Sequence, residues 1–578
     1  MSVITVENLR YRYPHAKELA LDGLDFSVEK GEFIGIIGEN GAGKSTLSQA
    51  LMGLVPQFYK GAYGGTVMVD GIEAGRTPVA QLCGHVGLVF QNPFNQLSGA
   101  KDNVYEEVAF GMQNLGVPAE KMKNRVEEAL KLLDIWQYRD RNPFDLSGGQ
   151  MQRVAIASVL VMRPDVMILD EPTSQLDPEG SDEVFKAVET LTGSGITILM
   201  IEQKIEKLAA YCDRILLLHK GKQIAFDTPQ KVFSMPDLNN YGIQAPAFTR
   251  ICKAEGVTLA DGTYPVTVEE AAGVLREKRL GVPACADGGE RAQKVTGTEL
   301  AQAGGPAESA GSSDEQFCIK NLDFSYLADV PVLKNLNMKL DKRPTAIIGQ
   351  NGAGKTTLVK LLKGLLKPVS GSICFHGEDI SGKTVAMLAG NVGYVFQNPD
   401  DQIFKYNVMD EILFGPLNIG MDAERAKKEA ERALKLTGLT GKEKENPYDL
   451  ELYERKMTAI ASVLAMDTDV LILDEPTIAQ DWKGRQIIGG IIRSLSECGK
   501  LVIAILHDMD FVAENFERVI IMAHGQVLAD GTAKGVFAQE EALKKARLQK
   551  PYVMQLCEAL GYEKSYLTVE ELLKDQVS

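Results

Sequence analysis

The chain of 578 residues is 45% hydrophobic and 24% charged, with a formal net charge of −16. A chain of this length is too long for a single hydrophobic core, so we expect several domains. The acidic balance disfavours a nucleic-acid partner, because phosphate binding requires basic surface, although it leaves room for a local basic patch.

No apolar run reaches the roughly 20 residues that a membrane-spanning helix needs, and the opening stretch MSVITVENLRYRYP lacks the basic and apolar regions of a signal peptide. The eight cysteines are scattered without a C-x-x-C pair. This is typical of free thiols in a reducing compartment rather than of disulfides or zinc ligands. These features predict a soluble protein that is not exported.

The sequence consists of two similar halves. GENGAGKST (38–46), VGLVFQNP (86–93) and VMILDEPT (166–173) recur as GQNGAGKTT (349–357), VGYVFQNP (392–399) and VLILDEPT (470–477). Similar tails, PVTVEEAAGVLRE and YLTVEELLKD, follow the two sets of motifs. Such self-similarity predicts two copies of one α/β nucleotide-binding domain, each followed by a small helical appendage.

The segment between the halves is rich in Gly, Ala and Ser and poor in large apolar residues. It cannot bury enough surface to fold alone, so we predict a flexible linker over 281–314 that keeps the halves close to each other. The predicted domains then cover 1–228 and 315–532, and the predicted helical appendages cover 229–280 and 533–578. We expect the two domains to pair within the chain.

In chain order, the first candidate is a tyrosine ahead of each glycine-rich loop. Tyr13 lies 31 residues before Lys44 (44 − 13), and Tyr326 lies 29 residues before Lys355 (355 − 326). Either ring could stack on an adenine base; the alternative is an ordinary aromatic residue in a strand.

GENGAGKS and GQNGAGKT match the phosphate-loop pattern G-x-x-x-x-G-K-[ST], each between a short apolar run and a helix-like segment. Glycines let backbone N–H groups surround phosphate oxygens, and the helix dipole adds positive potential. Lys44 and Lys355 are expected to reach the β- and γ-phosphates of ATP, and Ser45 and Thr356 to coordinate Mg²⁺. The predicted loop contacts are Gly38, Asn40, Gly41, Gly43, Lys44, Ser45 and Thr46, and Gly349, Asn351, Gly352, Gly354, Lys355, Thr356 and Thr357.

Gln91 and Gln397 end short strands and precede Asn-Pro, which starts a loop. Each is predicted to contact the metal and the attacking water. An isolated glutamine would carry almost no signal; the repeated position makes these two candidates.

LSGGQ (146–150) is predicted to open a helix. Its members Ser147, Gly148, Gly149 and Gln150 offer a hydroxyl and bare backbone N–H groups, an arrangement that binds anions. The same position in the second half reads LELYE (450–454), although the flanking NPFD or NPYD and AIASVL agree.

VMILDE and VLILDE are predicted buried strands that end in two carboxylates. Asp170 and Asp474 are expected to hold Mg²⁺, mainly through water, and Glu171 and Glu475 to polarise the attacking water. The alternative is a pair of solvated acids at a strand end.

These motifs, with Asp177 in SQLD and Asp481 in IAQD, resemble the ATP-binding cassette (ABC) family over residues 1–280 and 315–578. The resemblance implies two P-loop ATPase domains in tandem, each with a helical subdomain that begins near Gln91 or Gln397. It also implies head-to-tail pairing, with ATP and Mg²⁺ between the P-loop of one domain and the signature of the other.

Within this family, the stretches after Gln91 and Gln397 and the TVEE tails resemble the ATPases of energy-coupling-factor transporters. That resemblance implies a peripheral ATPase at the cytoplasmic face of the membrane, energising import of a vitamin or metal ion. Its partners would be integral membrane subunits, a transmembrane coupling component and a substrate-binding component. A sugar-importer ATPase and a soluble ribosome-associated ATPase are the alternatives.

The LELYE segment predicts asymmetry between the two ATP sites. Glu451 replaces the signature serine, and Leu452 and Tyr453 replace its glycines, so a carboxylate would repel the γ-phosphate and side chains would block the backbone. The family's switch histidine is His507 in the second half, whereas Gln203 occupies its place in the first half.

Under head-to-tail pairing, both departures fall on the site of the first P-loop, whereas random decay would affect both sites. We therefore predict that the second P-loop and LSGGQ form the working site, with Glu475, His507 and Gln397 as its catalytic residues. The competing interpretation is that Glu171 sustains residual hydrolysis at the other site.

Overall fold

The computed structural model describes residues 2–174, 176–280, 315–327 and 330–577, so the predicted linker at 281–314 lies outside the described residues. Among these described residues, no helix is long and apolar enough to cross a membrane. None of the seven cysteines among them forms a disulfide.

Each half is built on a six-stranded sheet in which only the last strand pair is antiparallel. The strand orders are β10-β9-β3-β8-β7-β6 and β16-β17-β18-β13-β19-β20. Their bounds are β3 Phe33–Ile37, β6 Val86–Val89, β7 Val166–Asp170, β8 Thr197–Ile201, β9 Arg214–His219 and β10 Lys222–Asp227, then β13 Thr345–Ile348, β16 Val392–Val395, β17 Val470–Asp474, β18 Leu501–Ile505, β19 Arg518–Ala523 and β20 Gln526–Thr532. The central strand β3, FIGII, is buried along its whole length, as a parallel strand covered on both faces must be.

A four-stranded antiparallel sheet lies beside each six-stranded sheet, in the orders β2-β1-β4-β5 and β12-β11-β14-β15. The bounds are β1 Ser2–Arg12, β2 Leu21–Glu29, β4 Ala62–Val69 and β5 Ile72–Glu73, and β11 Phe317–Leu327, β12 Val330–Leu340, β14 Ser370–Phe375 and β15 Glu378–Asp379. Its buried face joins the six-stranded sheet and the helix after the P-loop in one hydrophobic cluster in each half. The P-loop is therefore held between two sheets.

The helices follow the same pattern in both halves. Those of the first half are α1 Lys44–Leu51, α2 Leu54–Gln57, α3 Val79–Leu82, α4 Val104–Asn114, α5 Ala119–Leu132, α6 Gly148–Leu160, α7 Pro178–Gly193, α8 Ile205–Tyr211 and α9 Pro229–Phe233. Those of the second half are α12 Lys355–Leu362, α13 Val385–Leu388, α14 Val408–Asn418, α15 Ala423–Leu436, α16 Leu452–Leu464, α17 Trp482–Glu497, α18 Met509–Asn515, α19 Ala533–Phe537 and α20 Glu540–Ala546. The predicted α/β fold, present twice, is confirmed.

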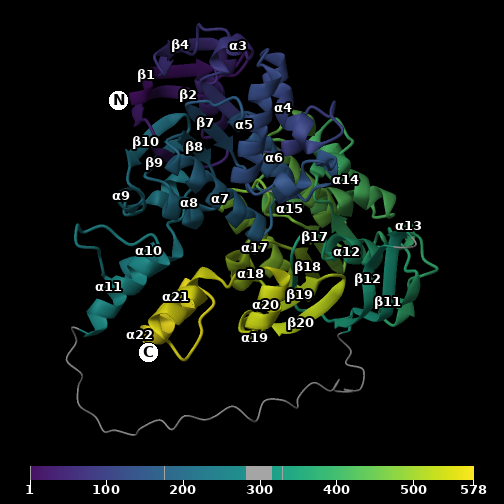
Figure 1. The fold of residues 1–578 in the computed structure, drawn as a ribbon. Coiled ribbons are helices and arrows are strands. Elements are labelled where there is room, and N and C mark those ends of the chain that lie inside the picture. Colours follow the sequence, from purple (N-terminus) through teal and green to yellow (C-terminus); the bar gives the residue numbers. More distant parts are fainter. Residues whose placement is uncertain (1, 175, 281–314, 328–329, 578) are drawn as a thin grey trace.

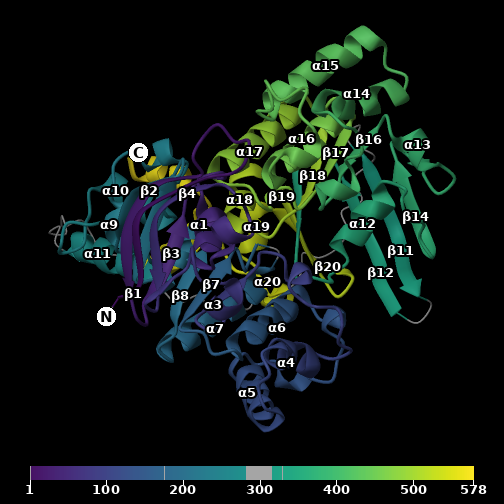
Figure 2. The same ribbon diagram turned by 90° about the horizontal axis from the view of Figure 1, so that it is seen from above.

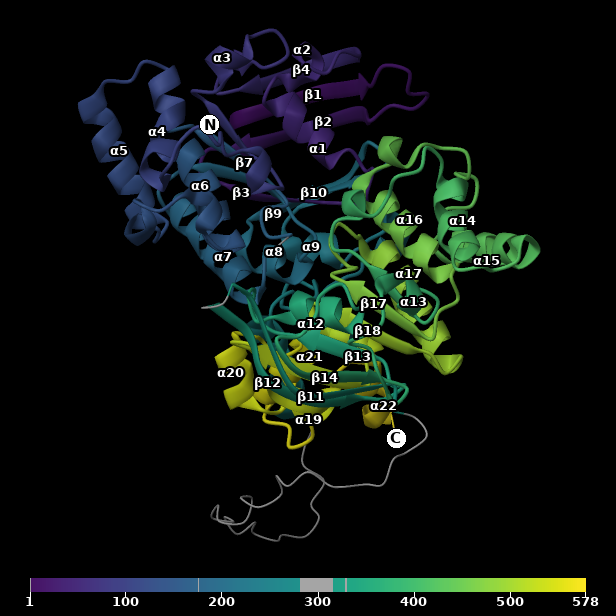
Figure 3. The ribbon, with the colours of Figure 1, turned by 90° about the vertical axis from the view of Figure 1, so that its right-hand side faces the viewer.

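The arms α4–α5 and α14–α15 project in opposite directions from the body of the molecule (Figures 2 and 3). In each half these two helices pack against α6 or α16, the helix that follows the signature position. The second arm is amphipathic: α15, AERAKKEAERALKL, buries Ala426, Ala430, Ala433 and Leu434 and exposes its charged residues.

The two appendages form a single hydrophobic unit. Helices α10 Ala247–Glu255 and α11 Val268–Leu280 lie beside α21 Tyr552–Leu560 and α22 Val569–Val577 (Figure 1). Phe248, Leu275 and Leu556 belong to one cluster of buried residues drawn from both halves. Each appendage alone would leave its apolar face exposed, so the pairing of the two stabilises both.

Leu556 is fully buried in this shared cluster. Leu556→Ala is expected to lower the free energy of local opening by about 2–5 kcal/mol, the usual effect of removing a large side chain from a packed core. Because the core is shared, amide hydrogen exchange should accelerate in α10 and α11 as well as in α21. Glu558→Ala, on the exposed side of α21, is the matched control and should change protection by less than about 1 kcal/mol. Acceleration confined to α21 and α22 would contradict a shared core.

Candidate active site

Both P-loops end in a glycine whose backbone no other residue would adopt easily. Gly43 and Gly354, at the N-termini of α1 and α12, have φ angles of 99° and 94°. A Cβ added at Gly43 would lie 2.5 Å from the Ala20 carbonyl oxygen. The close approach of backbone to backbone keeps the loop wrapped around the space in front of the helix.

The P-loop lysines are buried and point back into their own loops. Lys44 Nζ donates to the carbonyls of Gly38 at 2.8 Å and Glu39 at 2.9 Å. Lys355 Nζ makes the same two bonds, to Gly349 at 2.7 Å and to Gln350 at 2.9 Å. Each ammonium is thereby held at the position where the loop would enclose an anion.

The two candidate adenine-stacking tyrosines are tied to the helices that follow the P-loops. Tyr13 Oη lies 3.1 Å from Thr46 Oγ1 and donates to Gln49 Oε1 at 3.0 Å. Tyr326 Oη lies 3.3 Å from Thr357 Oγ1, and 58% of this residue is exposed. Both rings therefore border the nucleotide-binding region, and the second presents an open face.

The strand-end aspartates lie beside the P-loop hydroxyls, as the motifs predict. Thr356 Oγ1 donates to Asp474 Oδ1 at 3.4 Å, and Ser45 is hydrogen-bonded to Asp170. Burial raises the pKa of both aspartates, and these hydroxyls oppose the shift. Paired hydroxyl and carboxylate oxygens are ligands that Mg²⁺ prefers, so the residues present fit this ion.

The next residue, a glutamate in each half, is held from two sides. Glu171 accepts hydrogen bonds from Gln91 Nε2 at 2.6 Å and Gln203 Nε2 at 2.8 Å. Glu475 accepts one from Gln397 Nε2 at 2.7 Å, and its other oxygen lies 3.0 Å from His507 Nε2. The structure thus brings together the strand end, the Gln loop (residues 91–95 or 397–401) and the switch position.

Both glutamates also have positive φ angles, 46° and 49°. This left-handed conformation is uncommon for residues other than glycine and concentrates at functional sites. Their backbone N–H groups donate to Ile201 and Ile505 on the neighbouring strands, which holds the conformation in place.

The two glutamates differ in charge. Burial raises the pKa of Glu171 to about 7, with Asp170 and Glu202 adding to the shift and Lys44 opposing it. Burial acts on Glu475 as well, but His507, Lys355 and Lys456 outweigh it and lower the pKa to about 2. Glu475 therefore has the lower pKa of the two and loses its proton more readily.

The first P-loop and the LELYE segment line one cavity of about 480 Å³. Lys44, Asp170, Glu171 and Gln203 face Glu451 and Tyr453 across it. We call this the first site; the second site is the region around the second P-loop. The cavity establishes head-to-tail contact between the halves.

Glu451 begins α16 and reaches the opposite P-loop. A Cβ added at Gly41 would lie 3.6 Å from Glu451 Oε1. Burial and the neighbouring carboxylate of Glu454 raise the pKa of Glu451, and Lys44 opposes the shift. A carboxylate thus lies where the signature serine would place a hydroxyl.

Two aspartates join each P-loop to the other half. Asp481 Oδ2 accepts from the backbone N–H of Asn40 at 2.9 Å, and Asp177 Oδ2 accepts from that of Asn351 at 3.0 Å. In the intact signature, Ser147 and Gln150 form a capping box at the start of α6. A Cβ on Gly149 would lie 3.3 Å from the Cα of Gly180, so this glycine permits close packing of α6 on α7.

Two contacts at the sites escaped the sequence analysis. Lys483 Nζ forms an ion pair with Glu39 Oε2 at 2.7 Å across the two halves. Tyr394 Oη donates to Asp474 Oδ2 at 2.9 Å, whereas Leu88 occupies the corresponding position in the first half. Aligning the two halves would have drawn attention to Tyr394, because Leu88 stands in its place. No sequence pattern near Lys483 or Glu39 predicts their ion pair.

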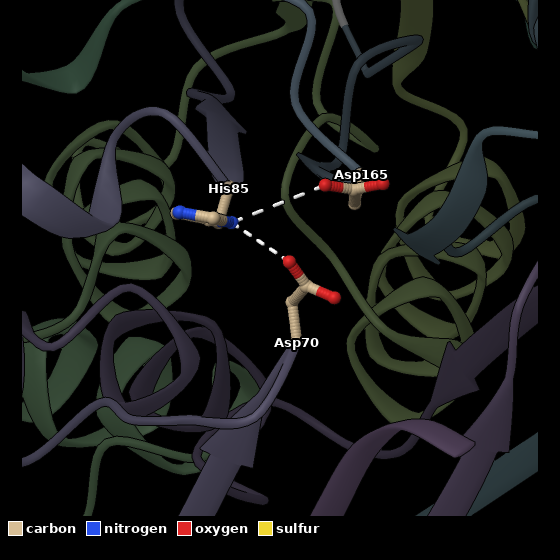
Figure 4. Close-up of side chains that lie close together, drawn as sticks. All are labelled: Asp70, His85 and Asp165. Carbon is tan, nitrogen blue, oxygen red and sulfur yellow. Dashed lines mark hydrogen bonds and ion pairs between the residues drawn. The ribbon is translucent and has the colours of Figure 1, made fainter. Parts of the chain in front are cut away.

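Asp70, His85 and Asp165 form a separate cluster on the surface of the first half (Figure 4). His85 Nδ1 lies 2.8 Å from Asp70 Oδ2 and 3.9 Å from Asp165 Oδ2. Lys30 Nζ also pairs with Asp165, at 2.9 Å. These ion pairs join the loops that precede β6 and β7 to the end of β4.

Comparison with known proteins agrees with this geometry. Residues 21–174 and 333–478 match the family model described as ABC transporter. A protein of Caldanaerobacter subterraneus subsp. tengcongensis, named as an ABC transporter ATP-binding protein, is 38% identical over 578 residues, which cover 99% of this chain and 98% of that protein. A protein of the same name from Methanosarcina acetivorans is 36% identical over 574 residues, covering 99% and 92%.

Among solved structures, the chain is similar to CbiO1 of Clostridium perfringens, described as part of the ABC transporter complex CbiONQ. The identity is 34% and the TM-score 0.37, with 42% of this chain and 99% of that chain covered.

The exposed ring of Tyr326 generates a prediction about nucleotide affinity. If the ring stacks on adenine, Tyr326→Ala should raise the KM for ATP about threefold to tenfold, the equivalent of roughly 0.5–1.5 kcal/mol of aromatic contact. Tyr326→Phe keeps the ring and removes only the hydroxyl near Thr357, so its KM should stay within about twofold. Equal effects of both substitutions in steady-state ATPase assays would argue against stacking.

Proposed function

The chain belongs to the ABC transporter family of ATP-binding proteins, and from this premise we propose that it is the ATP-hydrolysing subunit of an importer of energy-coupling-factor type. The cargo would be a micronutrient such as a vitamin or metal ion. Support for this subtype comes from the sequence after Gln397, NPDDQIF, and from the TVEE tails. We propose the domain division 1–228, 229–280, 281–314, 315–532 and 533–578 for this subunit.

The observation that best supports a difference between the two sites is that Glu171 and Glu475 have different pKa values. A general base for the attacking water must be ionised, and Glu475 is held ionised by the cations around it. Glu171 has the Lys44 ammonium nearby, but Gln203 and Gln152 stand where His507 and Lys456 stand in the second half. We therefore propose that hydrolysis takes place at the second site and that the first site mainly holds nucleotide.

At the second site, Glu475 accepts the proton of the attacking water while Gln397 and His507 fix the positions of its two oxygens. Lys355 and the P-loop amides hold the β- and γ-phosphates, and Tyr326 positions the base. Thr356 and Asp474 would hold Mg²⁺, which when bound neutralises phosphate charge. Ser147 and the amides of Gly148 and Gly149 complete the site from the first half.

At the first site, the Glu451 carboxylate opposes the approach of a γ-phosphate because both are negative and the space between them is partly buried. Leu452 and Tyr453 add side chains where the signature has bare backbone. Lys44, Ser45 and Asp170 retain the phosphate and Mg²⁺ groups, so binding without efficient turnover is the expected behaviour.

The helical subdomains carry exposed aromatic residues suited to a membrane partner. Phe94 and Phe144 stack at 5.9 Å in the first half, and Phe404 meets Phe414 at 4.6 Å in the second. Tyr406 beside them is 85% exposed. We propose that these surfaces bind the transmembrane coupling subunit at the cytoplasmic face, with a substrate-binding subunit completing the complex.

A fused ATPase of a sugar importer is the second candidate, and a ribosome-associated ATPase the third. The acidic chain and the Gly/Ala/Ser-rich linker argue against RNA. Affinity purification that recovers integral membrane proteins supports the transport role, whereas recovery of ribosomes would replace it.

If only the second site hydrolyses ATP efficiently, the same substitution should have different effects on hydrolysis at the two sites. In the purified full chain, Glu475→Gln should reduce steady-state ATP hydrolysis at least about a hundredfold, because the general base is lost. The matched variant Glu171→Gln should retain more than about half of the rate. An equal loss of hydrolysis in both variants would mean that both sites hydrolyse ATP, either independently or in alternation. It would refute the asymmetry but not the transport role.

The signature segments can be exchanged as a second check. Replacing Glu451, Leu452 and Tyr453 with Ser, Gly and Gly should raise the affinity of the first site for ATP about tenfold, because a repulsive carboxylate and two obstructing side chains are removed. The reverse replacement of Ser147, Gly148 and Gly149 should abolish turnover at the second site. Binding of a fluorescent ATP analogue, measured in the Glu475→Gln background, reports the first effect. Unchanged affinity would show that LELYE is no obstacle.

A further inference from the structure

The helix that begins with the LELYE segment carries a buried lysine that the first half lacks. Lys456 on α16 is 1% exposed, and its Nζ donates to the main-chain carbonyl oxygen of Gln397 at 2.5 Å. A buried ammonium is costly unless it is paired, so its retention beside the Gln loop calls for a function.

The first half provides an internal comparison. Gln152 occupies the corresponding position on α6 and is equally buried. Its Nε2 has no hydrogen-bond partner among the residues that the structure describes. Gln152 Nε2 therefore makes no link to the Gln loop, and among the described residues this link occurs in the second half.

A neighbouring contact between the helix and the Gln-loop region is the same in both halves. Gln96 Nε2 donates to the Ala155 carbonyl at 2.9 Å, and Gln402 Nε2 donates to the Ala459 carbonyl at 3.0 Å. These bonds fix the loop to the helix in the same way in both halves. Lys456 is thus an addition to a common framework, not a consequence of a different packing.

A second basic residue strengthens the same link. Arg455 Nε pairs with Asp400 Oδ1 of the Gln loop at 3.4 Å, where the first half has Met151 and Phe94. Two consecutive residues of α16 thus hold the loop that carries Gln397.

We propose that Lys456 is a positioning residue for ATP hydrolysis at the second site: its ammonium fixes the main chain of Gln397, and so keeps the Gln397 amide on Glu475. The inference rests on the proposed function, in which the second site is the one that turns over. The bond to the main chain sets where the Gln397 side chain starts, and that side chain donates to Glu475 Oε2 at 2.7 Å. Lys456 donates its hydrogen bond to Gln397, so it positions Glu475 through Gln397, in addition to the positive charge that it places near Glu475.

The test compares kcat and KM for ATP in the purified full chain. Lys456→Gln, which installs the residue of the first half, should lower kcat about tenfold and leave KM within about twofold, because Lys355 and Tyr326 still bind the nucleotide. Lys456→Met keeps the length of the side chain, suits a buried position and should give the same loss if Lys456→Gln fails to fold.

Lys363→Met is the matched control. Lys363 is another buried lysine of the second half, and its Nζ donates to the Val392 carbonyl at 2.5 Å, away from the Gln loop. Methionine stands at the corresponding position, Met52, of the first half. This control should leave kcat within about twofold; a loss equal to that of Lys456→Gln would indicate a general effect on folding and overturn the proposal.

A double-mutant cycle separates positioning from structure. Because the positioning effect of Lys456 needs the Gln397 side chain, Lys456→Gln should lower kcat much less in a Gln397→Ala background than the tenfold expected alone, with only the effect of its charge on Glu475 remaining. Fully additive losses, or an unchanged kcat in Lys456→Gln alone, would refute the inference. Activity that survives Glu475→Gln would instead refute the proposed function, so the two failures are distinguishable.

Discussion

The structure depends on two aspartate carboxylates that each hold both halves at once. Asp177 caps α7 in its own half by accepting from the Gly180 N–H, and with its other oxygen it accepts from the P-loop of the opposite half. Asp481 does the same for α17 and the first P-loop. A helix start in one half is thereby coupled to the phosphate loop of the other, so neither site is complete without the partner domain. The shared apolar core of the appendages adds a second contact between the halves, independent of the sites.

Within this near-symmetric frame, electrostatics distinguishes the two sites. The backbone conformations of Glu171 and Glu475 agree within a few degrees, and each accepts two side-chain hydrogen bonds or close contacts of similar length. Only the charges around them differ. A P-loop lysine lies near each glutamate, but His507 and Lys456 accompany only Glu475, whereas Gln203 and the carboxylate of Glu202 accompany Glu171. The fold therefore gives both sites the same geometry, and under the proposed function a few substitutions decide which site hydrolyses ATP.

The sequence predicts features that depend on contiguous residues and misses those that join distant ones. The P-loop glycines, the acid pairs and the capping box of LSGGQ are local patterns with a direct backbone consequence, so their placement followed from the motifs. The internal repeat also predicted that the same α/β fold occurs in both halves. The ion pair of Lys483 with Glu39 and the shared appendage core connect residues hundreds of positions apart, and no local pattern encodes them. Lys456 is an intermediate case, because the sequence marks it as unusual only when the two halves are aligned and Gln152 is found at the corresponding position.

Helix α16 and the residue that caps it contact both ATP sites. The first residues at the start of α16 replace the signature and place Glu451 against the first P-loop, while Lys456, little more than one turn further on, binds the Gln loop of the second site. Under the proposed function, substitutions at this helix start would weaken one site and support the other through the same rigid element. Two identical domains in a symmetric dimer could not separate these effects, because every change would appear at both sites. Fusing the halves into one chain removes that restriction and lets the two sites take different roles.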